Sequence, residues 1–106
     1  MKPDDLLTVS LSPPSAVLLV FTPSAWADRG QQASLTALTD RLQAQFGGLL
    51  RILRINEAMN PDVVRSFAIT QTPAFVLVRQ GTELWRQVGL SDEIPFALSI
   101  QRLLTA

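Results

Sequence analysis

The spacing of apolar residues changes from one segment of the chain to the next, and each change predicts a new element. A continuous apolar run over residues 16–21 is typical of a strand that is buried on both faces. From about Gln32, apolar residues recur at steps of three and four, which predicts an amphipathic helix that ends at Gly47 and Gly48. The apolar positions of this helix are Leu35, Leu38, Leu42 and Phe46.

The next two elements follow directly. Residues 50–55 are mostly apolar and predict a second strand. A helix should begin after Asn60, because asparagine is a favoured N-cap and because Pro61 and Asp62 suit the first helical turn. Met59 precedes this cap and is expected to act as a hydrophobic staple.

The C-terminal part of the chain predicts two strands and a helix. Residues 72–89 give two strands joined at Gln80 and Gly81, a pair that suits a tight antiparallel hairpin. The final helix is expected to start at Ser91 as its N-cap. The acidic residues of its first turn are Asp92 and Glu93, and its apolar stripe is Phe96, Ala97, Ile100, Leu103 and Leu104.

The predicted order is therefore strand, helix, strand, helix, strand, strand, helix. Strands joined by helices are expected to run parallel with right-handed crossovers, and the hairpin adds an antiparallel edge. This order predicts an α/β fold with one mixed sheet and helices on both faces. A chain of 106 residues, of which 47% are hydrophobic, suits a single domain.

Charge and hydropathy exclude several classes of partner. The nine basic and nine acidic residues give a formal net charge of zero, so there is no electrostatic footprint for nucleic acid or for an anionic membrane. The longest apolar run, "AVLLVF", is too short to span a bilayer, and Asp4 and Asp5 stand where a signal peptide would carry basic charge. We expect a cytoplasmic protein that binds neither nucleic acid nor membrane.

The absence of cysteine and histidine narrows the chemistry further. Without cysteine the chain has no disulfide, no thiolate nucleophile and no thiolate metal ligand, and without histidine it lacks the usual imidazole ligand and general base. No glycine-rich phosphate loop, paired-carboxylate site or metal-ligand cluster stands out in the sequence. We expect no catalytic residue, no metal and no cofactor.

From residue 16 to the C-terminus the chain resembles thioredoxin. "AVLLVF" is similar to the central strand of that family, "FAITQTPAFVLVRQG" to the segment that carries its cis-proline, and "VGLSDE" to its glycine turn before the last helix. The resemblance implies a thioredoxin-like fold, with a mixed central sheet of four or five strands flanked by helices on both faces. It implies a single domain, 1–106, with residues 16–106 as the core and residues 1–15 as an atypical N-terminal segment.

The functional argument comes from the departures from this family. By the resemblance Pro73, which follows Thr72, is the cis-proline. Thioredoxins carry W-C-G-P-C-K after the central strand, whereas this chain has "AWADRGQQ". If Trp26 takes the place of the family's tryptophan, residues 27–30 occupy the positions of the C-x-x-C motif. The family's buried acid, which helps to deprotonate the second cysteine, corresponds to a position near Val20, so this chain lacks that group as well. Because disulfide exchange needs an attacking thiolate, this chain cannot perform it.

A retained scaffold with an emptied active site predicts a redox-inactive protein that binds a polypeptide partner, in a chaperone or adaptor role. In the resembled fold, the backbone before the cis-proline pairs with an extended segment of the bound protein, and this mode needs only main-chain groups. Trp26 and Arg29 suit an interface, although packing over the sheet end is the alternative for Trp26 and a helix cap for Asp28. The predicted partner-binding residues are Trp26, Ala27, Asp28, Arg29, Gln71, Thr72 and Pro73.

Two other functions remain open. An enzyme of the glutathione-transferase type would use the hydroxyl of Ser24 or Thr22, because thioredoxin-fold transferases place a hydroxyl at this end of the first helix. A structural subunit with no separate activity would cover its apolar end surface with another protomer. A single sequence does not give the oligomeric state. Trp85 is expected to pack across strands of the sheet.

Overall fold

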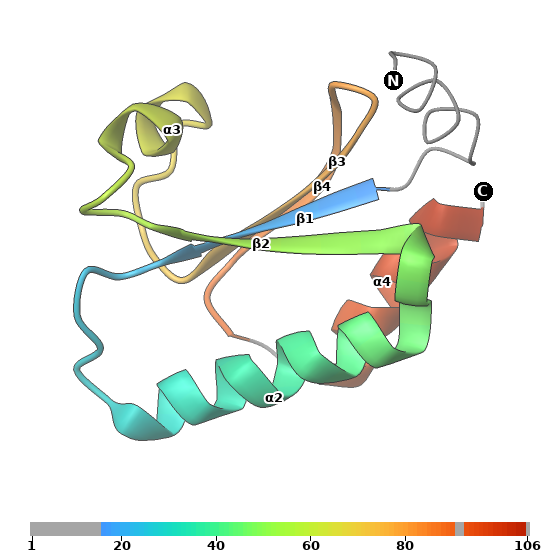
Figure 1. Ribbon diagram of the computed structural model, residues 1–106, viewed down its shortest axis with the longest axis horizontal. Coiled ribbons are helices and arrows are strands. Elements are labelled where there is room, and N and C mark those ends of the chain that lie inside the picture. The colour runs from blue at the N-terminus through green and yellow to red at the C-terminus, as the bar shows by residue number, and fades with distance from the viewer. Residues whose placement is uncertain (1–15, 91–92, 106) are drawn as a thin grey trace, which may run out of the picture.

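The computed structural model describes residues 16–90 and 93–105 (Figure 1). The elements are β1 (Ala16–Thr22), α2 (Arg29–Phe46), the 3₁₀ turn η1 (Gly47–Leu49), β2 (Leu50–Asn56), α3 (Pro61–Ser66), β3 (Ala74–Arg79), β4 (Thr82–Val88) and α4 (Glu93–Thr105). The expected N-terminal segment 1–15, the N-cap Ser91 with Asp92, and the side chain of Phe96 lie outside the described residues.

Four strands form one mixed sheet in the order β2-β1-β3-β4. β1 and β2 run parallel, with Ala16 opposite Leu50 and Thr22 opposite Asn56, as expected for two strands joined by a long helix. β3 runs antiparallel to β1 and also to β4. The described residues thus form the mixed sheet that the sequence predicts, with four strands.

The direction of β3 corrects the prediction that all strands joined by helices run parallel. β3 opposes β1 and therefore also opposes β2, although α3 connects β2 to β3. The six residues of α3 span about 9 Å, whereas a strand of seven residues such as β2 spans roughly 23 Å. Because α3 is too short to carry the chain back along the sheet, β3 starts at the end where β2 stops.

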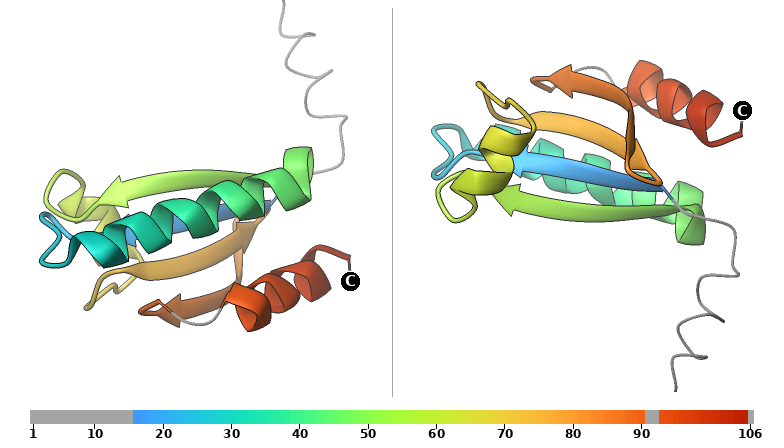
Figure 2. Two further views of the ribbon diagram at one scale, coloured as in Figure 1. Left: turned by 90° about the horizontal axis from the view of Figure 1, so that it is seen from below. Right: turned by 90° about the horizontal axis from the view of Figure 1, so that it is seen from above.

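The alternating side chains of the strands separate into two cores. Leu18 and Val20 of β1 point to the face that α2 and α4 cover, whereas Leu19 and Phe21 point to the face that α3 covers (Figures 1 and 2). The first core contains Ala16, Leu18, Val20, Leu35, Leu38, Leu42, Phe46, Leu50, Phe75, Leu77 and Ile100. The second core is centred on Phe21, Ala74 and Val76. Helices therefore lie on both faces, as predicted.

The predicted hairpin joins β3 and β4. Gln80 and Gly81 have φ angles of 52° and 79°, and a two-residue hairpin loop of type I′ requires positive φ at both positions. Trp85 pairs with Leu77 across the hairpin and packs against the first core, which confirms its predicted role.

The starts of the two inner helices differ in part from the prediction. α2 begins at Arg29, earlier than the predicted Gln32, because Asp28 acts as its N-cap. α3 begins directly after Asn60 as predicted, but the Asn60 side chain makes no capping hydrogen bond. Its Nδ2 instead donates to the backbone oxygen of Asn56 at 3.2 Å.

Met59 does not act as the expected hydrophobic staple, since the residue is 80% exposed. The Asn56 Oδ1 accepts the backbone N–H groups of Ala58 at 2.9 Å and Met59 at 3.2 Å. These two hydrogen bonds turn the chain tightly after β2 and leave the Met59 side chain in solvent.

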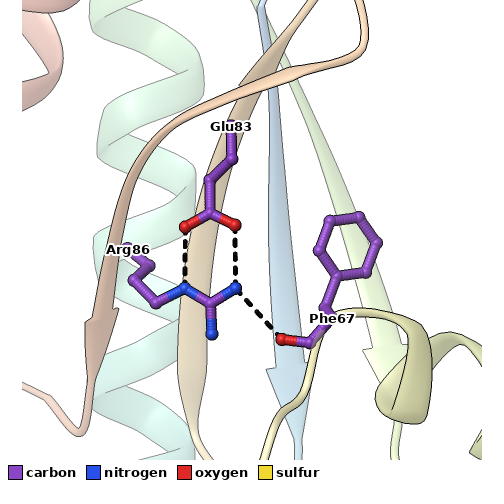
Figure 3. A network of polar contacts seen from close by, with 3 residues as sticks. All are labelled: Phe67, Glu83 and Arg86. Carbon is purple, nitrogen blue, oxygen red and sulfur yellow. Dashed lines mark hydrogen bonds and ion pairs between the residues drawn. The ribbon is translucent and has the colours of Figure 1, made fainter.

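A bulge in β4 helps to fasten α3 to the sheet. Leu84 is an extra residue between the paired residues Glu83 and Trp85, so Glu83 and Arg86 lie on the same face instead of on opposite faces. Arg86 donates from Nε and Nη2 to the Glu83 carboxylate, each at 2.7 Å, and Nη2 also donates to the backbone oxygen of Phe67 at 3.0 Å (Figure 3). These hydrogen bonds from Arg86 lower the pKa of Glu83 below its ordinary value.

The Phe67 ring makes a second contact between the end of α3 and the sheet. Its centroid lies 5.8 Å from that of Phe21, with the two rings tilted by 57°, an arrangement that aromatic pairs favour. The backbone and the ring of Phe67 therefore hold the C-terminal end of α3 in place.

Candidate functional site

Four segments meet at one end of the sheet: the loop after β1, the turn after β2, the segment between α3 and β3, and the residue after β4 (Figures 1 and 2). The strand directions bring them together, because β1, β2 and β4 end here and β3 begins here. In the sheet, Phe21 lies opposite Ala74, and Ala74 lies opposite Val88. Residues predicted from two distant parts of the sequence therefore share this end.

The segment before β3 contains the predicted proline. The Thr72–Pro73 peptide bond is cis, the isomer that the resemblance implies. Pro73 is buried, and its carbonyl oxygen accepts the N–H of Gly89 at 2.7 Å. Gly89 has a φ of 83°, a left-handed conformation that glycine adopts readily. Thr72 is half-buried and Gln71 is exposed.

The loop after β1 presents the other predicted residues. Trp26 is half-buried and packs against the first core, whereas Ala27, Asp28 and Arg29 are exposed. The Asp28 Oδ1 accepts the N–H of Gly30 at 2.7 Å, so Asp28 caps α2, the alternative role given for it in the sequence. Trp26 likewise packs over the sheet end while part of its surface stays accessible.

Glu57 is a residue of this end that the sequence reasoning missed. Its Oε2 accepts the backbone N–H of Ser24 at 3.1 Å, and its Oε1 accepts the hydroxyl of Thr72 at 3.1 Å. Its own backbone N–H donates to the carbonyl oxygen of Thr22 at 2.9 Å. A usable signal existed, because parallel strands that are adjacent end at the same edge, and Glu57 directly follows β2.

Within the described residues, the Thr72 backbone has unused hydrogen-bonding capacity. No hydrogen bond joins its N–H or its C=O to another residue in 16–90 or 93–105. Its hydroxyl, in contrast, donates to Glu57. Thr72 therefore offers main-chain groups, with its side chain already engaged.

The two hydroxyls considered for catalysis lie in different surroundings. Thr22 is only 8% exposed, and its Oγ1 donates to the carbonyl oxygen of Ile55 at 3.4 Å. Ser24 is exposed, and its contact with Glu57 uses its backbone N–H. Over the described part of the chain, no three acidic side chains gather as candidate metal ligands. None of the helices described here has the length and apolarity to cross a membrane.

Comparison with known proteins gives the fold. No family model matches the sequence, and no curated protein is significantly similar to it. Among solved structures, thioredoxin-2, described as a component of the malaria parasite protein secretion machinery, has a TM-score of 0.74 and 19% identity, covering 84% of each chain. The germline-specific thioredoxin Deadhead of Drosophila melanogaster has a TM-score of 0.74 and 18% identity, covering 94% of this chain and 91% of its own.

A thioredoxin from Trypanosoma brucei brucei has a TM-score of 0.74 and 13% identity, covering 99% of this chain and 88% of its own. The mixed four-stranded sheet with helices on both faces is thus an α/β fold of the thioredoxin type. The sequence contains no cysteine, so this scaffold carries none of the thiols of a disulfide oxidoreductase.

Proposed function

We propose that this cysteine-free chain of thioredoxin-like fold binds an extended segment of a polypeptide partner, in a chaperone or adaptor role in the cytoplasm. The contact region is called here the cis-proline surface. It consists of Trp26, Ala27, Asp28, Arg29, Gln71, Thr72 and Pro73.

The observation that carries this proposal is the backbone of Thr72. Its N–H and C=O make no hydrogen bond within the described residues, and the residue lies beside a cis-proline at the end of the sheet where β3 begins. An extended peptide binds such groups as an added strand would, with main-chain hydrogen bonds for affinity and nearby side chains for selectivity. This mode requires no thiol, so it is compatible with the loss of both cysteines.

The side chains around Thr72 support the same function. Trp26 is anchored on the first core yet still partly accessible, and partly exposed aromatic residues held in place by packing are common anchors of interfaces. Arg29 follows three residues later in the chain, is exposed, and supplies a second residue type that is enriched at interfaces. Asp28 contributes less to this surface, because its Oδ1 already accepts a hydrogen bond from the first turn of α2.

A cross-linked pull-down from a lysate of the source cell tests the proposal. The bait variants are the wild type, a Trp26→Ala/Thr72→Arg variant, and a Gln45→Arg control. Gln45 is exposed on α2 and lies outside the cis-proline surface, so it controls for the added arginine. Each variant is first compared by circular dichroism and urea unfolding, so that loss of binding is not confused with loss of fold.

We expect the wild type and Gln45→Arg to recover the same discrete protein, and Trp26→Ala/Thr72→Arg to lose it. A segment of the recovered protein, added as a synthetic peptide, should then shift the backbone amide resonance of Thr72. Equal recovery by all three baits, or no protein above background, would contradict binding at the cis-proline surface.

A further inference from the structure

Glu57 lies outside the cis-proline surface but contacts Thr72 of this surface and the loop that leads to Trp26. One carboxylate oxygen accepts the Ser24 N–H, in the loop that leads to Trp26, and the other accepts the Thr72 hydroxyl, each at 3.1 Å. The backbone N–H of Glu57 is bound to Thr22 at the end of β1. A single residue therefore connects three points on two separate segments.

The chemistry of the carboxylate suits this bridging role. An ionised carboxylate only accepts hydrogen bonds, and its two oxygens can serve two donors at once. Hydrogen bonds to a charged acceptor are stronger than those between neutral groups. Glu57 is half-buried, and no ion pair among the described residues includes it, so these two neutral donors are its side-chain partners there.

The segments that Glu57 joins have few other constraints near the contact points, apart from the Asn56 Nδ2, which donates to the carbonyl oxygen of Pro23 at 3.5 Å. Ser24 and Thr72 both lie outside the helices and strands, so neither belongs to a regular hydrogen-bond ladder. The Thr72 backbone has no partner among the described residues. The Glu57 carboxylate is therefore the shared contact between the loop after β1 and the residue before the cis-proline.

We infer that Glu57 is a positioning residue of the cis-proline surface. By accepting hydrogen bonds from Ser24 and Thr72 with one carboxylate, it fixes the spacing between the Trp26 loop and the Thr72 backbone. The loop and the backbone are therefore already positioned when a partner binds. This inference rests on the proposed function for its effect on binding. Its effect on the free protein is independent of any partner.

The chain permits a graded set of variants. Glu57→Gln keeps both contacts, because its amide oxygen can accept the Ser24 N–H while its amide nitrogen donates to the Thr72 hydroxyl. Glu57→Ala removes both contacts, and Thr72→Val removes one of them while keeping the shape of the side chain. Glu83→Ala is the matched control, because it removes another carboxylate with two hydrogen bonds that lies away from this end.

The first experiment measures amide exchange in the free protein by saturation transfer from water in NMR. We expect Glu57→Ala to raise the Ser24 exchange rate about fivefold, the factor that loss of roughly one net hydrogen bond gives. Glu57→Gln and Glu83→Ala should leave this rate close to that of the wild type. Thr72→Val should raise it less, and should add nothing in the Glu57→Ala background.

An unchanged Ser24 rate in Glu57→Ala would overturn the inference, whatever the partner is. A uniform rise in exchange along the whole chain would also overturn it, because that result would mean a general loss of stability. Additivity of Glu57→Ala and Thr72→Val would show that the carboxylate does not couple the two segments.

The second experiment measures affinity for a peptide selected on the wild type from a phage-displayed library of short random peptides. If Thr72→Arg abolishes binding, Glu57→Ala should weaken it about fivefold, and Glu57→Gln should restore most of the affinity. Loss with Thr72→Arg but none with Glu57→Ala would overturn the inference and leave the proposed function standing. Peptides that are all insensitive to Thr72→Arg would instead overturn the proposed function.

Discussion

The first turn of α2 offers a sharp test of how the loop after β1 is built. The Asp28 carboxylate accepts the N–H of Gly30 at 2.7 Å and so satisfies a donor that has no partner within the helix. Replacing an N-cap aspartate by alanine typically lowers the free energy of unfolding by about 1 kcal/mol. Loss of a negative charge at an exposed helix N-terminus adds about 0.5 kcal/mol. We therefore expect Asp28→Ala to cost about 1.5 kcal/mol in total.

Asp28→Asn separates these two contributions. Asparagine caps a helix about as well as aspartate, because its side-chain oxygen accepts the same N–H. Only the charge is lost, so we expect a decrease of about 0.5 kcal/mol in the free energy of unfolding. Asp40→Ala is the matched control, since Asp40 is exposed in the middle of α2, where alanine favours the helix.

Urea unfolding followed by far-ultraviolet circular dichroism measures these differences, and thermal unfolding provides a second estimate. For a domain of this size, 1 kcal/mol corresponds to a shift in Tm of about 4 °C. Equal effects of Asp28→Ala and Asp28→Asn would show that the charge alone matters and would refute the capping argument. No difference between Asp28→Ala and Asp40→Ala would refute both contributions.

Three other predictions concern the helix start and the sheet. An alanine Cβ at Gly30 would lie 3.0 Å from the Asp28 Oδ1, so Gly30→Ala should raise the free energy of unfolding by less than the ~1 kcal/mol that helix propensity usually gives. In an Asp28→Ala background the same substitution should give the full gain. Equal gains in the two backgrounds by urea unfolding would contradict this prediction. Phe21 is fully buried, so Phe21→Ala should lower the free energy of unfolding by about 3–5 kcal/mol, and a cost near 1 kcal/mol by the same measurement would contradict the packing described. Arg86 lowers the pKa of Glu83 from 4.5, so the ion pair stabilises the fold above pH 4.5 and this stabilisation is lost as the pH falls through the lowered pKa. The difference in unfolding free energy between the wild type and Glu83→Gln should therefore shrink in acid. A difference that does not depend on pH would contradict this prediction.

The hydrophobic pattern was sufficient to predict most of the elements. Leu35, Leu38 and Leu42 repeat at helical spacing and are all buried, because burial on one face is what the repeat reflects. The hairpin was equally predictable, since Gly81 lies between two strand-like runs and readily adopts the positive φ that a tight turn requires. Such local signals depend only on nearby residues.

The direction of β3 required information that periodicity does not contain. An alternating or apolar run indicates a strand but not which way the strand runs. The length of the connecting helix decides that, and Pro61–Ser66 is too short for a parallel return. Sequence reasoning placed the start of this helix correctly but did not weigh its length against that of β2.

The residues of the candidate site also fall into two groups: those that local sequence features identify and those that they do not. Trp26, Asp28 and Thr72 were found because they stand next to recognisable sequence features. Glu57 was not, since its partners are 33 and 15 residues away in sequence and meet it only in the folded sheet. Its contacts depend on the parallel register of β1 and β2, which no local pattern specifies.

The Glu57 bridge also predicts how this protein varies among species. A hydrogen bond between two side chains survives a substitution at one position only if the other position still offers a matching group. An acid or amide at residue 57 should therefore accompany threonine or serine at residue 72, and an apolar residue at one position should accompany an apolar residue at the other. Such paired substitution would identify relatives of this chain, which has no cysteine pair by which to recognise them.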